Sequence, residues 1–138
     1  DFFSLPYMHA WYVVALMNPN TLFYAYTKST SWWVGGINEF PILHNFVLTA
    51  SMGGTQDHVT ENYGLRKAVV VFSEAEAAEL GLEIDHDDSH AAKPSLRDQD
   101  FALLIHGTQP AGSKAAQALK ELKGKGSYSR KKKKETVS

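Results

Sequence analysis

The chain has 138 residues, the size of one ordinary domain, and its 43% hydrophobic and 12% aromatic content excludes a chain that is disordered throughout. It contains no cysteine, which excludes a disulfide, a thiolate nucleophile and a zinc site built on cysteine. The formal net charge is −1, so any charged partner would depend on how the charges are distributed.

A helix is the first predicted element. Ser4 is a suitable N-cap, and Pro6 falls in the first turn, where its missing N–H costs nothing. The Asn-Pro-Asn segment at 18–20 ends the helix. Because the helix is apolar nearly all round, we expect it to pack on more than one side. The apolar residues at helical spacing are Leu5, Met8, Tyr12 and Leu16.

Buried strands alternate with helices along the rest of the chain. Strands are predicted at residues 21–27, 45–50, 67–72 and 101–106. The intervening segments are a loop at 28–36, a weak helix or turn at 56–63, a short helix between the Ser73–Glu76 capping box and Gly81, a polar stretch at 83–100, and a final amphipathic helix at 114–122. This order predicts an α/β fold with a parallel sheet of strand–helix repeats.

The strand ends carry the candidate catalytic residues. Parallel sheets bind ligands beyond the carboxyl ends of their strands. We therefore name the polar residues at those ends, which are Lys28, Ser51, His106 and Gln109. Among them, His106 is the natural general base or metal ligand, because histidine changes its charge near neutral pH.

The loop before the last helix has the glycine spacing of a phosphate-binding loop. Four residues separate Gly107 from Gly112, and Ser113 follows. Glycines let backbone N–H groups approach phosphate oxygens, so we name these three residues as anion-binding candidates. However, Lys114 follows the serine instead of preceding it, and Pro110 lacks an N–H. Nucleotide hydrolysis, a looser anion site and a plain turn capped by Ser113 remain open interpretations.

Carboxylates and imidazoles gather in the polar stretch before the last strand. Side chains of these types, packed closely, can hold a divalent metal ion. The spacing matches no EF-hand, since the required Gly and Glu are absent. The alternative is a solvated acidic loop in which Asp88 or Ser89 caps a turn. The metal-ligand candidates are Asp85, His86, Asp87 and His90.

Aromatic residues cluster around the first strand and the loop after it. Phe23 is expected in the core, whereas Trp32 and Trp33 fall in the loop beside two glycines. Exposing two tryptophans is costly, so they line either a pocket or an interface. Together with Tyr24 and Tyr26, these rings could stack on a base or a sugar.

The segment 124–138 is predicted to be a disordered basic tail. Residues 130–134 carry five positive charges, and the chain outside 130–135 has nine Lys and Arg against fourteen Asp and Glu, a net charge of −5. Such an acidic body repels phosphates. Weak contact with nucleic acid would therefore come from the tail, unless the tail only increases solubility.

Several segments resemble the family of uncharacterised phage and bacterial proteins called gene product 88. The resemblance runs from Asp1 to about Tyr128. It is carried by residues 1–4 (DFFS), 23–29 (FYAYTKS), 51–54 (SMGG), 85–88 (DHDD) and 105–110 (IHGTQP). Members look as if they have a cysteine-rich N-terminal segment, followed by an Asp-Ser-Gly-Asp-Phe stretch whose last two residues match Asp1 and Phe2.

The resemblance implies that residues 1–123 are a fragment of a larger α/β domain. We expect the C-terminal half of a metal- or iron–sulfur-dependent enzyme, whose metal or cluster is held by the missing cysteines. By analogy of fold, an incomplete TIM-like barrel is implied. A small molecule or phosphate is the expected ligand. The alternatives are a non-enzymatic nucleic-acid-binding module that uses the tail, and a structural phage component.

The sequence contains no signal for a membrane and no common catalytic motif. No run of about 18 apolar residues occurs, so no membrane contact is expected. The absence of cysteine is compatible with the cytoplasm, which would be the host cytoplasm for a phage protein. Because Gly-x-Ser-x-Gly, His-Glu-x-x-His and Gly-x-Gly-x-x-Gly are all absent, whether the protein is an enzyme stays open.

Overall fold

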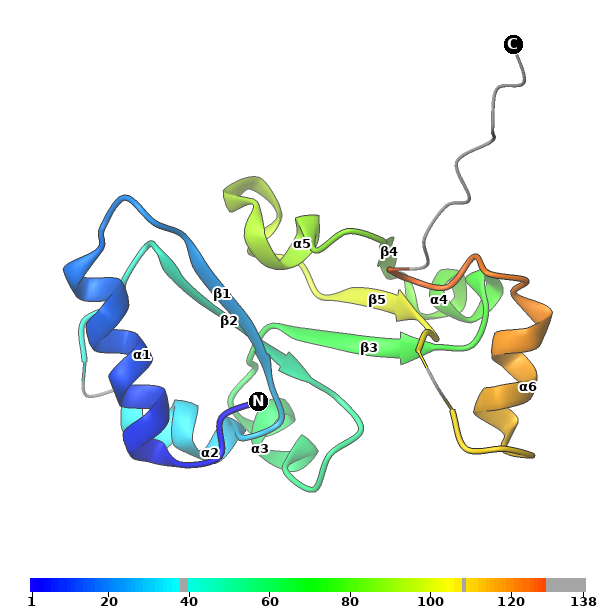
Figure 1. Ribbon diagram of the computed structural model, residues 1–138, viewed down its shortest axis with the longest axis horizontal. Coiled ribbons are helices and arrows are strands. Elements are labelled where there is room, and N and C mark those ends of the chain that lie inside the picture. The colour runs from blue at the N-terminus through cyan, green and yellow to red at the C-terminus, as the bar shows by residue number, and fades with distance from the viewer. Residues whose placement is uncertain (38–39, 108, 129–138) are drawn as a thin grey trace, which may run out of the picture. The chain divides into compact units, whose positions relative to one another are not determined.

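The computed structural model describes residues 1–37, 40–107 and 109–128, and it has a mixed α/β fold (Figure 1). The helices are α1 (Leu5–Met17), α2 (Thr30–Trp32), α3 (Asp57–Asn62), α4 (Glu74–Leu80), α5 (Ser89–Ala92) and α6 (Lys114–Glu121). The strands are β1 (Phe23–Thr27), β2 (Phe46–Ser51), β3 (Lys67–Val71), β4 (Glu83–Asp85) and β5 (Phe101–Leu104). A π-helical turn (Trp33–Ile37) and a 3₁₀ turn (Pro94–Leu96) complete these elements.

The strands form one parallel sheet in the order β1-β2-β3-β5-β4. β1 and β2 pair from Phe23 opposite Phe46 to Thr27 opposite Ala50, and β3 joins β2 with Lys67 opposite Ala50. The predicted parallel sheet of strand–helix repeats is confirmed. Among the described residues the sheet is not closed, since β1 and β4 lie at its edges, so a TIM-like barrel is not shown.

The chain divides into two compact units. Unit 1 contains residues 1–69 and 88–101, and unit 2 contains residues 70–87 and 102–138. The sequence predicted one α/β domain at 1–123 and a tail at 124–138, and that division stays a prediction. Each unit is described below by itself.

Helix α1 of unit 1 buries one side. Ser4 caps it as predicted, because its hydroxyl accepts a hydrogen bond from the amide of Tyr7 at 3.2 Å. Met8 packs with Phe2 and Leu48 in a buried core cluster. Leu16 and Met17 remain 56% and 74% exposed. The expected packing on more than one side is therefore not observed among the described residues.

The segment predicted as the loop 28–36 is instead largely helical. Helix α2 and the π-helical turn occupy it, and both tryptophans are half-buried against the core cluster. Gln56 holds the start of this segment. Its side-chain oxygen accepts from the amide of Ser31 at 2.8 Å, and its carbonyl accepts from the hydroxyl of Thr30 at 3.2 Å. Gln56 lies 25 positions after Ser31 in the sequence. Local sequence signals therefore could not indicate the helical segment that it holds.

Helix α4 of unit 2 has the predicted capping residues in a shifted arrangement. The hydroxyl of Ser73 accepts from the amide of Glu76 at 3.1 Å. The Glu76 carboxylate accepts from the amide of Phe72 at 2.7 Å, one residue before the N-cap. The helix ends at Gly81, whose φ of +69° favours glycine.

The polar stretch 83–100 contains more regular structure than the sequence predicted. Strand β4, helix α5 and the 3₁₀ turn all fall within it. Phe23, which was expected in the core, is only half-buried. Residues 124–128, which the sequence assigned to the tail, include the fully buried Ser127. The rest of the predicted tail, residues 129–138, lies outside the described residues.

Candidate functional site

The structure brings Lys28 and Ser51 together at the carboxyl ends of β1 and β2. Parallel pairing places Thr27 opposite Ala50, so the next residue of each strand lies at the same edge. The Lys28 ammonium donates to the Ser51 hydroxyl at 3.1 Å, to the Ser51 carbonyl at 3.4 Å and to the Met52 carbonyl at 2.8 Å. Two of the four predicted catalytic residues are therefore in direct contact.

The two glycines after β2 make room for the lysine side chain. A Cβ atom added at Gly54 would lie 3.2–3.4 Å from three carbon atoms of Lys28, and one added at Gly53 would lie 3.8 Å from its Nζ atom. Gly53 also has a φ of +95°, a conformation that side-chain-bearing residues rarely adopt. The Gly-Gly turn thus lets the backbone lie directly against the side chain of Lys28.

Asp1 fastens the end of β1. Its carboxylate accepts hydrogen bonds from the Thr27 hydroxyl at 2.7 Å, the Lys28 amide at 2.9 Å and the Phe2 amide at 2.7 Å. These contacts hold the backbone from which the lysine side chain extends. Asp1 therefore positions Lys28 through its backbone and leaves the ammonium group to other partners.

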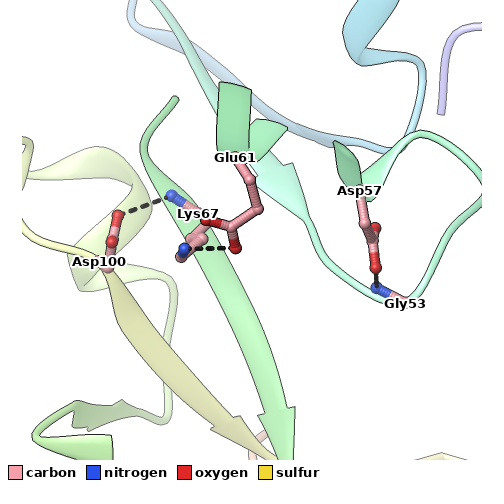
Figure 2. Close-up of polar contacts among 5 residues, drawn as sticks. All are labelled: Gly53, Asp57, Glu61, Lys67 and Asp100. Atoms are coloured by element: carbon pink, nitrogen blue, oxygen red, sulfur yellow. Dashed lines mark hydrogen bonds and ion pairs between the residues drawn. The ribbon is translucent and has the colours of Figure 1, made fainter. Parts of the chain in front are cut away.

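A second carboxylate orders the turn after β2. The amides of Gly53 and Gly54 both donate to Asp57, the first residue of α3, at 3.0–3.2 Å. Figure 2 shows this carboxylate pointing back to Gly53. Two converging backbone N–H groups form a small anion-binding concavity, which here holds the chain's own carboxylate.

Among the described residues, no carboxylate neutralises the charge of Lys28. Its three acceptors are neutral oxygens, and no described carboxylate lies within ion-pair distance of its exposed ammonium. Lys67 differs in this respect. It forms a 2.8 Å ion pair with Glu61, while its backbone amide donates to Asp100 at 2.9 Å (Figure 2). The strand-end lysine therefore keeps a positive charge available to an anionic ligand.

His106 and Gln109 belong to unit 2, after β5. The side-chain amide of Gln109 donates to the His106 carbonyl at 2.8 Å. The Nδ1 atom of His106 lies 3.1 Å from the Leu104 carbonyl, and its ring meets the Tyr128 ring edge-on at 4.9 Å. A carbonyl can only accept, so this contact requires Nδ1–H, which leaves a lone pair on Nε2 in the neutral ring.

The predicted phosphate-binding loop contains a Ser113-capped turn. The hydroxyl of Ser113 accepts from the Ala116 amide at 3.0 Å, so Ser113 caps α6 as the turn interpretation expects. Gly107 and Gly112 have φ values of +72° and +75°, which glycine tolerates best. Thr108 lies outside the described residues. Anion binding by this loop stays a prediction.

The metal site predicted from Asp85, His86, Asp87 and His90 is not shown. Within residues 1–37, 40–107 and 109–128, no group of three or more acidic, histidine or cysteine side chains is arranged to hold a metal ion. Asp85 is buried at the end of β4, whereas His90 is buried in α5 with its ring 5.3 Å from that of Phe101. Packing explains the burial of His90 because a core histidine can fill space as an aromatic ring does.

Asp88, which with Ser89 was one of two candidates for capping a turn, accepts hydrogen bonds from β1. The hydroxyls of Tyr24 and Tyr26 both donate to its carboxylate at 3.0 Å. Since both hydroxyls are engaged, these tyrosines anchor α5 to β1 within unit 1.

The basic run 130–134, which the nucleic-acid alternative requires, lies outside the described residues. None of the helices in the described ranges has the length and apolar character that crossing a membrane requires.

Comparison with known proteins identifies the family. The model of the family described as gene product 88 matches residues 1–124, which is most of the chain. The chain belongs to the gene product 88 family. This phage-type family match confirms the resemblance of its strand-end segments. No curated protein and no solved structure matches this gene product 88 protein.

Sequence reasoning missed two residues of the strand-end site. Asp1 was noted only as part of a family segment, and its bond to Thr27 spans 26 positions. Asp57 had a local signal, because an aspartate three residues after a Gly-Gly pair can accept their amides. No comparable signal exists for Asp1, whose role follows only from the folded structure.

Proposed function

We propose that the carboxyl ends of β1 and β2 bind an anionic small-molecule substrate, with Lys28 as the cation and Ser51 as the hydroxyl group. The observation that supports this proposal is the set of neutral oxygens around an exposed ammonium. A carboxylate or phosphate oxygen would supply the missing negative charge. The location agrees with the rule that parallel sheets bind ligands beyond their strand ends.

The proposed protein is an enzyme that binds its substrate through an anionic group. Within unit 2, His106 is proposed separately as a general base, because its Nε2 atom carries the lone pair when Nδ1–H contacts Leu104. Gln109 is proposed to fix the backbone next to that ring. A dependence on a metal or iron–sulfur cluster, and membership in an incomplete TIM-like barrel, are implied by the family resemblance alone. The anion site requires neither.

Titration with inorganic phosphate tests the site directly. We expect the amide resonances of Gly53 and Gly54 to shift and saturate in NMR spectra of the wild-type protein. Lys28→Met removes the charge but keeps most of the stem, and should weaken phosphate binding about tenfold or more, since hydrogen bonds to charged groups contribute about 1.5–3 kcal/mol. Lys67→Met is the matched control, because its ammonium already pairs with Glu61.

The outcomes separate the parts of the proposal. If Lys28→Met binds phosphate as tightly as the wild-type protein, or if no saturable shift occurs, the anion site is wrong. His106→Ala tests the separate proposal for unit 2 in an assay of activity. Unchanged activity would remove His106 from the proposed function and leave Lys28 unaffected.

A further inference from the structure

A cavity lies within unit 1, along the amino-terminal half of β2. Its volume is about 460 Å³. Small-molecule sites usually have volumes of about 300–1,000 Å³. Aromatic side chains of Tyr12, Trp33, Phe40 and Phe46 form much of its wall. The cavity is therefore large enough, and apolar enough, for a ring-containing molecule.

Two arginines give this apolar cavity a positive charge. Arg66 precedes β3 and Arg97 follows the 3₁₀ turn, and both line the cavity. Arg66 donates to the His90 carbonyl at 2.6 Å, to the Ala91 carbonyl at 3.3 Å and to the Thr49 hydroxyl. All of these acceptors are neutral, so they orient the guanidinium without neutralising it.

Arg97 is also held by neutral acceptors. It donates to the His44 carbonyl at 2.7 Å and to the Ala92 carbonyl at 3.5 Å. Its Nε atom is buried and has no hydrogen-bond partner among the described residues. A buried donor without an acceptor is unfavourable, and a ligand oxygen would supply the acceptor.

The positive charge of Arg97 acts on the Arg66 guanidinium. Burial is the largest influence and lowers the pKa of Arg66 from its ordinary value, whereas Tyr26 raises this pKa and the charge of Arg97 lowers it. Asp98 and Asp100 raise it, but both are exposed and neither forms an ion pair with Arg66. The cavity is therefore lined by two positively charged guanidiniums. Within the described part of the chain, neither of them forms an ion pair with a carboxylate.

We propose that this cavity binds a small organic anion with a flat, apolar body, of the aryl carboxylate class. The carboxylate would lie between the guanidiniums of Arg66 and Arg97, and the ring would pack against Trp33 and its aromatic neighbours. Arginine suits this role because its planar fork binds carboxylates and stacks on rings. The cavity lies toward the amino end of β2, whereas Lys28 and Ser51 lie at the carboxyl ends, so the proposal is independent of the proposed function.

Binding of 2-naphthoate to the whole chain tests the proposal, with its neutral amide, 2-naphthamide, as the matched probe. Isothermal titration calorimetry should show that the anion binds the wild-type protein at least about tenfold more tightly than the amide, the difference expected for a charge-assisted hydrogen bond. Arg97→Gln should remove this preference. Lys93→Gln is the control, because it changes the net charge equally on an exposed residue that does not line the cavity.

Further variants keep the test decisive. Arg97→Lys restores the charge without the fork, so we expect an intermediate affinity. The Trp33 indole resonance should shift on saturation with 2-naphthoate. In Lys28→Met, the naphthoate-induced shift of the Trp33 indole resonance should persist, which distinguishes this cavity from the strand-end site. Equal affinity for the two probes, unchanged naphthoate affinity in Arg97→Gln, or no binding at millimolar concentrations would overturn the proposal.

Discussion

Ser127 pairs with Leu104 through both its backbone and its side chain. The Ser127 amide donates to the Leu104 carbonyl at 3.2 Å, and the Leu104 amide donates to the Ser127 hydroxyl at 2.9 Å. The same hydroxyl donates to the Asp85 carbonyl at 2.5 Å. One buried side chain thus connects β5 with the end of β4 in unit 2.

We expect Ser127→Ala to destabilise the protein by about 2 kcal/mol, because a buried amide and a buried carbonyl each lose a partner. Urea unfolding monitored by circular dichroism measures the change. Ser95→Ala is the control, since Ser95 is exposed and should tolerate the change within about 0.5 kcal/mol. Equal stability of the two variants would show that the hydroxyl bridge does not contribute.

Asn45 connects the end of α1 to the start of the sheet. Its buried side-chain amide donates to the carbonyls of Ala15, Asn18 and Thr21 at 2.9–3.0 Å. Asn45→Ala should reduce the free energy of unfolding by about 2–3 kcal/mol, because these carbonyls lose their donor. A loss below about 0.5 kcal/mol in urea unfolding would contradict this role.

Asn45→Asp should show a pH dependence that Asn45→Ala lacks. Burial beside carbonyl oxygens would raise the folded-state pKa of the introduced carboxyl group, so the folded state would bind its proton more tightly than the unfolded state. Stability should therefore decrease as pH rises from about 4 to 7, relative to the wild-type protein. Urea unfolding of both variants across this pH range measures the effect. Equal slopes of stability against pH for Asn45→Asp and Asn45→Ala would contradict the prediction and would mean that water reaches the site.

Much of the strand-end site could be predicted from the sequence, for a simple physical reason. The buried strands are apolar runs of limited length, so their ends are visible, and parallel pairing brings those ends to one edge. Lys28 and Ser51 were named on this basis, and they are in contact. The bond from Asp1 to Thr27 could not be predicted, because no local pattern indicates a contact across 26 positions.

Other parts of the fold depend on partners that are distant in sequence. Strand β4 contains only Ile84 between two acidic residues, which is too short for an alternating pattern. Ser127, whose hydroxyl donates to the Asp85 carbonyl, lies 42 positions further along the chain. The cavity between Arg66 and Arg97 lies toward the amino end of β2, where the strand-end rule does not direct attention. The sequence indicated a pocket or an interface only through its two adjacent tryptophans, of which Trp33 lines the cavity, and no pattern pointed to either arginine.

Gly54→Ala should impair the strand-end site without unfolding the protein. The new Cβ atom would lie 3.2–3.4 Å from carbons of the Lys28 side chain, which must move by a few tenths of an ångström. We expect phosphate affinity to fall several-fold, while urea unfolding changes by no more than about 1 kcal/mol. Gly35→Ala is the control, because a Cβ atom there meets nothing within 4 Å. If both variants bind phosphate equally well, the close packing against Lys28 is irrelevant to the site.

The shifted capping arrangement of α4 leads to a prediction that distinguishes the contribution of Ser73 from that of Glu76. Ser73→Ala should cost about 1 kcal/mol, the usual contribution of an N-cap hydroxyl. Glu76→Ala should cost a further 0.5–1.5 kcal/mol, roughly one hydrogen bond, because the Phe72 amide loses its acceptor. Glu76→Gln should retain most stability, since the amide oxygen still accepts, whereas the favourable charge near the helix N-terminus is lost. Glu79→Ala, on an exposed side chain of the same helix, is the control in urea unfolding. If Glu76→Ala and Glu79→Ala are equally stable, the carboxylate does not hold the turn before α4, and Ser73 alone caps the helix.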